Sequence, residues 1–347
     1  MAMQKKAIFL GVLSGLLFGI ATPISKLLMV SLSSYSMAGL LYLGAALVFL
    51  PDMIKNYKAD FAPALIKSNG LKLAGIVLFG GMLGPMFLLA GLKNAQSTSV
   101  SIWLNFELIA TAILGVLFFK EHLSKYALVG IVFTLASGVV VSLNENMSGL
   151  QSGILIMLAC ASWGVDNHLT AIVDGISSKA TTFIKGLVGG IANITIGILF
   201  FNTADLWQGQ SLLAILLGMV AYGLSIVLYI STTHIIGATR GQILFSTSPL
   251  WGILGAALLL AEPIRWITIL SFALLTVGVF FSNVSGHSHD HVHEETEHIH
   301  LHNHSDGHHF HEHFGLDKDK LHVHIHSHPD LAHAHDHFPD LHHRHDH

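Results

Sequence analysis

The sequence predicts an all-α membrane protein with ten transmembrane helices in two inverted five-helix repeats, followed by a disordered cytosolic tail. Hydrophobic residues make up 52% of the 347 residues and charged residues only 11%, whereas ordinary soluble domains contain about 25% charged residues. Apolar runs of about 20 residues, the length that a helix needs to cross a bilayer, recur up to position 283. The last 61 residues hold 23 histidines and too little apolar surface to fold alone.

The apolar runs predict the helices in order. The first follows Lys5 and Lys6 but continues without a small-residue cleavage site, which indicates a membrane helix rather than a signal peptide. The second is short, so a count of nine helices stays open. We expect the ten helices at 7–30, 35–50, 71–92, 97–119, 126–143, 150–173, 180–201, 211–232, 238–260 and 265–283.

Lysines and arginines predict the orientation, because in short loops these residues stay on the cytoplasmic side. With a cytoplasmic N-terminus, eleven of them fall inside and two outside. We therefore expect a multi-pass protein of the cell membrane with both termini in the cytosol. The inside set is Lys5, Lys6, Lys55, Lys58, Lys67, Lys72, Lys120, Lys125, Lys179, Lys185 and Arg240, and the outside set is Lys93 and Arg265.

The second half of the apolar region, 150–283, repeats the first, 7–143. Glu121 closes the segment KNAQSTSVSIWLNFELIATAILGVLFFKEHLSK, and Glu262 stands at the same place in HIIGATRGQILFSTSPLWGILGAALLLAEPIRW. Aromatic–glycine pairs, Phe18-Gly19 and Trp163-Gly164, lie near the start of each half. Five helices is an odd number, so the second copy must enter the membrane upside down, as in secondary transporters with a substrate site between the halves.

In these features the sequence resembles the EamA-type members of the drug/metabolite transporter superfamily over residues 7–283. Small-residue turns, Ala95-Gln96-Ser97-Thr98 and Gly237-Ala238-Thr239-Arg240, precede helices four and nine, and Pro249 lies within helix nine. The first half departs from the pattern, because Glu107-Leu108 stands where the corresponding proline is expected. The resemblance implies a small secondary transporter, usually an exporter of metabolites or drugs. The sequence has no nucleotide-binding glycine loop, nucleophile–base pair or soluble catalytic domain, so we expect no enzyme.

Glu107 is the first candidate transport residue, because a charge within a membrane helix costs about 2.5–3.5 kcal/mol and is by default functional. It is the eleventh residue of the run 97–119, near mid-membrane, with Trp103 one turn earlier on the same face and Asn105 nearby. Desolvation favours the protonated carboxyl, which suits a proton carrier. Such a carboxyl also suits cation binding. The alternative is a structural carboxyl paired with a base.

A second cluster, Asp166, Asn167 and His168, lies in the run 150–173. We expect it at the cytosolic entry of the transport path, or as a polar patch at the cytoplasmic mouth. Asp166 and His168 are two residues apart and point in different directions on a helix, so they cannot bind one ion without unwinding. Lys185 is the expected counter-charge to Asp166 or Glu107, unless it extends to the interface. Asn193 either lines the path or joins two helices.

Small residues in the apolar runs predict packing. Glycines four residues apart, Gly15/Gly19, Gly80/Gly84 and Gly186/Gly190, let helices approach closely. The single cysteine, Cys160, excludes an internal disulfide and is expected in the core.

The tail, 286–347, predicts an exchangeable array of metal sites rather than a closed four-ligand site. Imidazole is the commonest side-chain ligand for zinc, nickel, cobalt and copper, and repeated His-x-His provides overlapping ligand sets. From His287 onward the tail carries a net charge of −9, against +5 for the remainder, so a pH sensor or a metal buffer stays open. Candidate ligands are His287, His289, His291, His293, His298, His300, His302, His304, His322, His324, His326 and His328.

These features favour a proton-coupled exporter of a small solute, with a divalent transition metal as the favoured cargo. The alternative is an exporter of an organic metabolite or drug, with the tail as a metal or pH sensor or buffer. The buried Glu107 and the repeat disfavour a third hypothesis, a sensor or store merely anchored by the helices. No cofactor is required. The expected partners are the lipid bilayer and the solute or metal ion, with no nucleic acid and with a homodimer left open.

Overall fold

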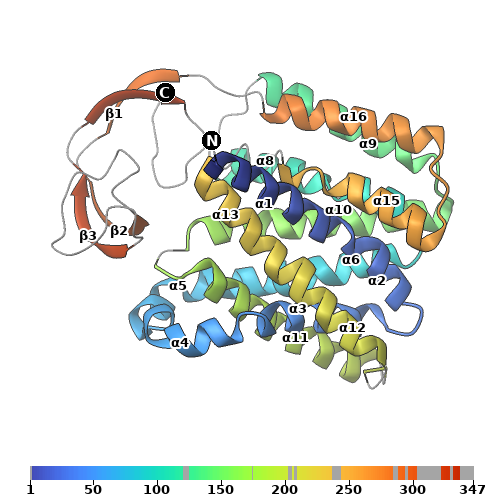
Figure 1. The fold of residues 1–347 in the computed structure, drawn as a ribbon, viewed down its shortest axis with the longest axis horizontal. Coiled ribbons are helices and arrows are strands. Elements are labelled where there is room, and N and C mark those ends of the chain that lie inside the picture. The colour runs from blue at the N-terminus through green and yellow to red at the C-terminus, as the bar shows by residue number, and fades with distance from the viewer. Residues whose placement is uncertain are drawn as a thin grey trace.

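The structure is a computed structural model, and it describes residues 2–119, 125–173, 175–201, 205–206, 209–236, 244–283 and four tail segments, 288–293, 296–302, 322–328 and 331–336. Seven of its helical spans are long and apolar enough to cross a membrane, and three shorter apolar helices accompany them. These ten fall one for one on the predicted runs and confirm an all-helical membrane protein (Figure 1).

The helices of each half follow one another with short connections. The first half contains α1 (Ala2–Gly19), α2 (Ala21–Leu28), α3 (Ser34–Leu47), α4 (Leu50–Asp60), α5 (Pro63–Gly75), the π-helix η1 (Ile76–Leu83), α6 (Gly84–Leu92), α7 (Ser97–Trp103), α8 (Phe106–Phe119) and α9 (Lys125–Ser142). The second half contains α10 (Met147–Ala171), α11 (Ser178–Phe201), α12 (Gly209–Leu217), the π-helix η2 (Gly218–Leu224), α13 (Ser225–Ile236), α15 (Ser248–Leu260) and α16 (Trp266–Asn283).

Helix α4 and the first turns of α5 occupy a connection for which no helix was predicted. This segment contains charged residues, but it forms a helix with one apolar face. Met53 on α4 is buried at 4% exposure in a small second core with Leu73, Ile76 and Ile176, while Lys55 is exposed. A hydrophobicity search for membrane spans does not detect such a short amphipathic helix.

The two halves share the same irregularities at an offset of 142 residues. The π-helix η1 begins at Ile76 and η2 at Gly218. The fourth predicted membrane helix, 97–119, is interrupted at Leu104 and Asn105, between α7 and α8, and is called helix four below. The ninth, 238–260, is interrupted at Ser246 and Thr247, before α15. Irregular helix geometry of this kind is uncommon and often marks functional segments. Its recurrence indicates that each half is a copy of one five-helix unit.

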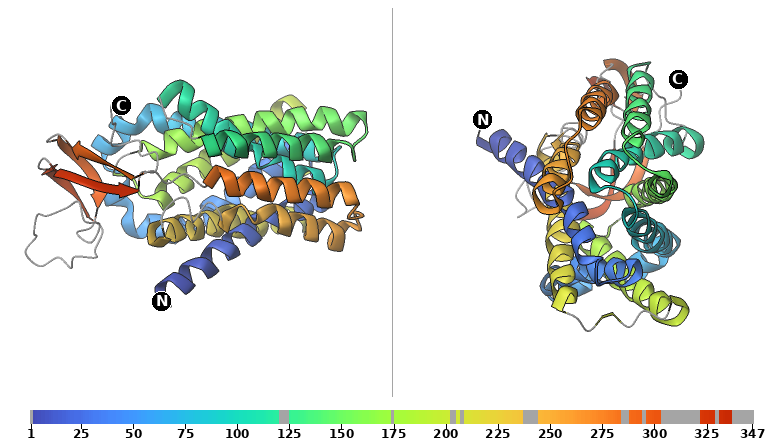
Figure 2. Two further views of the ribbon diagram at one scale, coloured as in Figure 1. Left: turned by 90° about the horizontal axis from the view of Figure 1, so that it is seen from above. Right: turned by 90° about the vertical axis from the view of Figure 1, so that its right-hand side faces the viewer.

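Packing between the halves is also reciprocal. Equivalent helices meet in pairs, α3 with α11 and α9 with α16. The contact of α6 with α10 has its counterpart in that of α13 with α1, and the contact of η1 with α11 has its counterpart in that of η2 with α3. Figure 2 shows the helices running side by side along the bundle, with the start of α1 and the tail strands toward the same end.

Glycines allow the closest of these contacts, as their spacing predicted. A Cβ added to Gly186 of α11 would lie 2.6 Å from the carbonyl oxygen of Tyr42 on α3. At Gly19 of α1 it would lie 2.2 Å from the carbonyl oxygen of Ser248 on α15. Backbones can approach this closely only where side chains are absent.

The described part of the tail consists of two separate antiparallel pairs. Strand β1 (Ser288–His293) pairs with β4 (Leu331–Asp336), and β2 (Thr296–His302) pairs with β3 (His322–His328). The composition predicted no secondary structure here, so these strands are an addition to the prediction. They form no layered domain, and two-stranded pairs alone are at best marginally stable in water.

We predict that Gly218→Ala destabilises the bundle, because the new Cβ would lie 2.0 Å from the carbonyl oxygen of Leu41 on α3. Overpacking of this kind costs about 1–3 kcal/mol, so thermal unfolding in detergent should begin several degrees lower. Gly209→Ala is the control, since nothing lies within 4 Å of its added Cβ. Equal melting of the two variants would contradict the close contact of η2 with α3.

Candidate functional site

The π-helix η1 presents two backbone carbonyls to side chains from three other helices. The carbonyl oxygen of Gly80 accepts hydrogen bonds from the Tyr42 hydroxyl on α3, at 2.6 Å, and from the Trp163 indole N–H on α10, at 3.3 Å. The carbonyl oxygen of Gly81 accepts one from the Asn193 amide on α11, at 2.8 Å. Neighbouring helices thus supply the polar partners that a bilayer lacks. Asn193 therefore joins two helices, the second of its two predicted roles.

Asp166 occupies the space left by the missing side chain of Gly80. A Cβ on that glycine would lie 2.3 Å from the Asp166 carboxyl carbon. The carboxylate accepts a hydrogen bond from the Lys185 ammonium at 2.8 Å and one from the Thr170 hydroxyl at 3.3 Å. The side chains of Asp166 and Lys185 are only 5% and 15% exposed. Lys185 is thus the counter-charge of Asp166 and does not extend to the interface.

Glu107 lies in the first turn of α8, directly after the interruption of helix four. Its carboxylate accepts a hydrogen bond at 2.8 Å from the amide of Asn167 on α10, which also donates to the Thr111 hydroxyl at 3.3 Å. Among the described residues no cation forms an ion pair with Glu107, although Asp166 and Lys185 lie within electrostatic range of it. The partial positive charge of a helix N-terminus favours a negative group at this position.

The charges of this site do not balance. Glu107 and Asp166 are two acids, and Lys185 is the one base that bonds to either of them among the described residues. The ionised set has a net charge of −1, which is costly within an apolar bundle. Protonation of Glu107 or binding of one positive charge removes that excess. The site is therefore suited to exchange a proton for a cationic solute.

Two of the remaining candidates, Trp103 and Asn105, form hydrogen bonds to groups other than Glu107. The Trp103 indole N–H donates to the carbonyl oxygen of Gly138 on α9, at 3.1 Å, and the side chain is 1% exposed. Trp103 was predicted to share a helix face with Glu107. The helix is interrupted between them, at Leu104 and Asn105. The Asn105 amide lies 3.5 Å from the carbonyl oxygen of Ser101, four residues earlier in α7.

His168 faces α8, where its Nε2 lies 2.9 Å from the carbonyl oxygen of Thr111. Asp166 faces α11 instead, so the two side chains diverge as their spacing predicted. Within the residues whose side chains are described, no three His, Cys, Asp or Glu side chains gather into a metal site. His287 and His304 lie outside the described residues. For the ten other predicted tail ligands only the backbone of the strands is described.

Three supporting residues escaped sequence analysis. Tyr42 and Gly81 lie in apolar runs without a distinguishing signal, and only the structure brings them to η1. Cys160 was expected only as a core residue, yet its thiol lies 3.6 Å from the carbonyl oxygens of Trp103 and Leu104 at the interruption of helix four. A thiol is a weak donor, and here it adds a second contact to the Leu104 carbonyl, which also accepts a hydrogen bond from the backbone N–H of Glu107.

Comparison with known proteins agrees with this architecture. The model of the EamA-like transporter family matches residues 5–143 and 151–284. An uncharacterized transporter of Methanothermobacter thermautotrophicus is 24% identical over 282 residues, which cover 76% of this chain and 82% of that protein. A solved crystal structure of a protein, 14% identical, covers 80% of this chain and 96% of its own with a TM-score of 0.58, and shows the fold alone.

We predict that Lys185→Met lowers the free energy of unfolding by about 3–5 kcal/mol, because it leaves a buried carboxylate unpaired. Adding Asp166→Asn should restore most of this loss, since neither charge then remains. Lys179→Met is the control, because the pair of Lys179 with Asp52 is 43% and 37% exposed and such pairs contribute about 0–1 kcal/mol. Unfolding in detergent measures all three variants. A similar loss for the two lysine variants would contradict an interior ion pair.

Proposed function

The chain belongs to the EamA-like transporter family, and from this premise we propose that it is a proton-coupled exporter of a small cationic solute. The observation that carries the proposal is the unbalanced charge around Glu107, which bonds to the neutral amide of Asn167 rather than to a cation. One group can then alternate between a proton and a positively charged cargo. Alternating occupancy of a shared carboxylate is sufficient to couple the two movements.

Each side chain around Glu107 has a part in this proposal. Asn167 holds the carboxylate toward α10 through a bond that loses strength when the carboxyl is protonated. The Asp166–Lys185 pair supplies a fixed dipole nearby, and the proposed entry lies along α10 where Asp166, Asn167 and His168 succeed one another. No cofactor takes part in this scheme.

A divalent transition metal is the first cargo to test, because of the tail. In the strand register His298 lies opposite His326, His300 opposite His324 and His302 opposite His322. Directly opposed residues have Cβ atoms about 4.5–5.5 Å apart, a spacing that supports shared metal ligation. The tail would capture or sense the metal, and the bundle would export it.

An organic metabolite or drug is the second candidate, and an observation in the bundle favours it. The described residues there include no group of three metal-ligating side chains, and the excess charge of −1 fits a singly charged organic cation. The tail would then act as a metal or pH sensor or as a buffer.

We propose that the protein works in the cell membrane with both termini in the cytosol. Lysine and arginine residues concentrate in the loops of one side. The start of α1 and the tail strands lie toward one end of the bundle (Figure 2), which supports a common side for the termini. A homodimer stays a prediction.

We predict that metal-challenged cells expressing the full chain lose one of zinc, nickel, cobalt or copper, and that Glu107→Gln abolishes this loss. The amide has the shape of the carboxyl but can bind neither a proton nor a cation in exchange. Asp52→Asn is the control, because that carboxylate lies in a partly exposed pair far from α8 in sequence. Total cellular metal is the measurement. Equal metal contents in all three strains would contradict Glu107-dependent export of these metals and move the proposal to the organic solute.

We predict that the purified full chain binds several zinc or nickel ions and that a chain ending at Asn283 loses them. Changing His298, His300, His302, His322, His324 and His326 to alanine should reduce the number of bound ions without abolishing binding, because the ligand sets overlap. Equilibrium dialysis with elemental analysis gives the number of ions per chain. Unchanged binding by the truncated chain would refute metal binding by the tail.

A further inference from the structure

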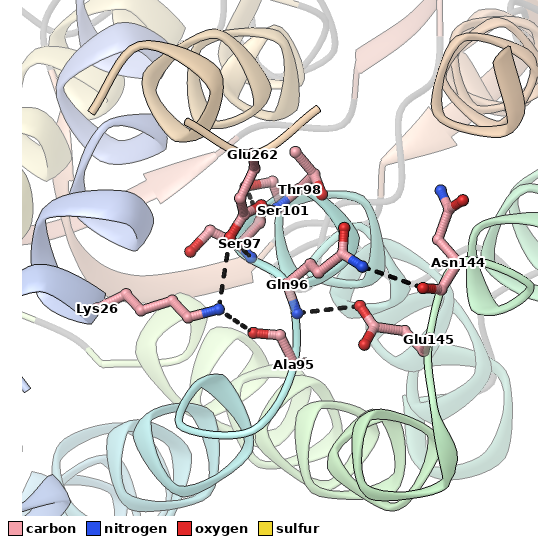
Figure 3. Close-up of polar contacts among 9 residues, drawn as sticks. All are labelled: Lys26, Ala95, Gln96, Ser97, Thr98, Ser101, Asn144, Glu145 and Glu262. Carbon is pink, nitrogen blue, oxygen red and sulfur yellow. Dashed lines mark hydrogen bonds and ion pairs between the residues drawn. The ribbon is translucent and has the colours of Figure 1, made fainter. Parts of the chain in front are cut away.

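The turn before α7 is held from several directions by side chains that come from far along the chain. Figure 3 shows Lys26 and Glu145 reaching this turn and the first two residues of α7, together residues 95–98, from opposite sides, with Glu262 above them. We call Lys26, residues 95–98, Glu145 and Glu262 the inter-repeat cluster. Lys26 and the turn belong to the first half of the chain, Glu262 to the second, and Glu145 to the connection between them.

Glu262 makes the central contacts of this cluster. One carboxylate oxygen accepts a hydrogen bond from the backbone N–H of Ser97 at 2.8 Å, and the other accepts one from the N–H of Thr98 at 2.9 Å. The Lys26 ammonium lies 3.4 Å from the first of these oxygens and also donates to the carbonyl oxygen of Ala95. The side chain of Glu262 is only 11% exposed. Lys26 and Glu262 thus form an ion pair.

The connection between the repeats, residues 144 and 145, also forms hydrogen bonds with this turn. The Glu145 carboxylate accepts a hydrogen bond from the backbone N–H of Gln96 at 3.0 Å, and the Gln96 amide donates to the carbonyl oxygen of Asn144 at 3.0 Å. Asn144 in turn donates to the hydroxyl of Thr268 on α16, at 3.1 Å. Four consecutive residues, 95–98, are thus bonded to three other parts of the protein.

The backbone conformation of Ala261 directs the side chain of Glu262 toward this turn. Ala261, directly after α15, has a φ of 52°, and it is the one residue other than glycine with a positive φ in the described chain. The N–H of Glu262 bonds back to the carbonyl oxygen of Ala256. This sharp ending of α15 turns the next side chain away from the α15 axis and toward the start of α7.

Two other polar contacts between the repeats lie at the ends of α3 rather than at α7. Asp205 accepts hydrogen bonds from the backbone of Ser33 and the hydroxyl of Ser36 at the start of α3, and Lys179 bonds to Asp52 just beyond its other end. These links are present at both ends of α3 at once, so they hold the α3–α11 pair together. The inter-repeat cluster is set apart because it holds α7, which continues through the interruption at Leu104 and Asn105 into the helix of Glu107.

We propose that Glu262 is a positioning residue for transport: with Lys26 it closes one end of the bundle by tying the second repeat to the start of α7, and this contact opens in the transport cycle. The inference rests on the proposed function, because a transporter must close each end of its path in turn. Release of the carboxylate removes the polar link between the end of α15 and the start of α7. The interruption of helix four then lets α7 move while α8 keeps Glu107 beside Asn167.

Cysteine accessibility tests this proposal without a known substrate. In a full-length chain with Cys160→Ala, Ser25→Cys is the reporter, because Ser25 lies beside Lys26, is 1% exposed and has no hydrogen-bond partner for its hydroxyl among the described residues. A membrane-impermeant maleimide is applied to the purified protein in detergent. We expect slow labelling of this parent, and labelling on the order of tenfold faster after Glu262→Gln, which weakens the contacts of the closed end.

Two controls separate opening from loss of structure. Asp205→Asn removes a carboxylate that bonds to backbone at the start of α3, and it should leave the reporter slow. Ser137→Cys reports the buried α9–α16 contact, where the serine hydroxyl donates to the carbonyl oxygen of Ser271 at 2.7 Å, and it should stay unlabelled in every variant. Glu262→Asp retains the charge and should label more slowly than Glu262→Gln.

The outcomes are distinct. Fast labelling confined to Ser25→Cys in the Glu262→Gln chain supports the proposal. Unchanged labelling there, or equal acceleration by Asp205→Asn or at Ser137→Cys, overturns it, because Glu262 would then be a local cap or a general stabiliser. Since the labelling needs no cargo, failure to find a transported solute leaves this result intact, and the two proposals can fail separately.

Discussion

Within a bilayer no water satisfies a polar group, and this constraint determines how the irregular parts of the bundle are built. The carbonyls of η1 receive hydrogen bonds from α3, α10 and α11, and the carbonyls at the interruption of helix four face the thiol of Cys160. For the same reason the nearly buried carboxylate of Asp166 is paired with the ammonium of Lys185. Glu107 is the exception in which a neutral amide replaces a counter-charge, and this exception makes it suited to exchange.

The duplicated architecture also explains why the two halves differ in chemistry. Pro249, near the start of α15, and Glu107, near the start of α8, each follow an interruption, at positions 142 residues apart. Proline begins a helix well because its N–H needs no partner there, whereas a carboxylate is favoured by the helix N-terminus. The same backbone break thus accepts either residue. One repeat has a proline at this break, and the other has the half-buried carboxylate of Glu107.

Much of the fold could be predicted from the length and order of the apolar runs, and the repeat from its closing glutamates and aromatic–glycine pairs. The interruption at Leu104 and Asn105 could not, because no proline marks it and the apolar pattern continues through it. In the candidate site, sequence analysis left two acids, Asp166 and Glu107, as partners of Lys185, and the structure shows Asp166. The partner of Lys26 was missed, because Glu262 lies 236 residues away and its approach depends on the left-handed Ala261.

The absence of an ion-pair partner for Glu107 among the described residues has an energetic consequence for transport. If Glu107 is the only exchangeable group, each turnover moves at most one proton. Swapping one proton for a monovalent cation transfers no net charge, so the membrane voltage neither drives nor opposes it. Swapping one proton for a divalent ion moves one positive charge outward, which costs about 2.3 kcal/mol for every 100 mV of inside-negative potential. The stoichiometry imposed by one side chain therefore decides whether export depends on voltage or on the pH gradient alone.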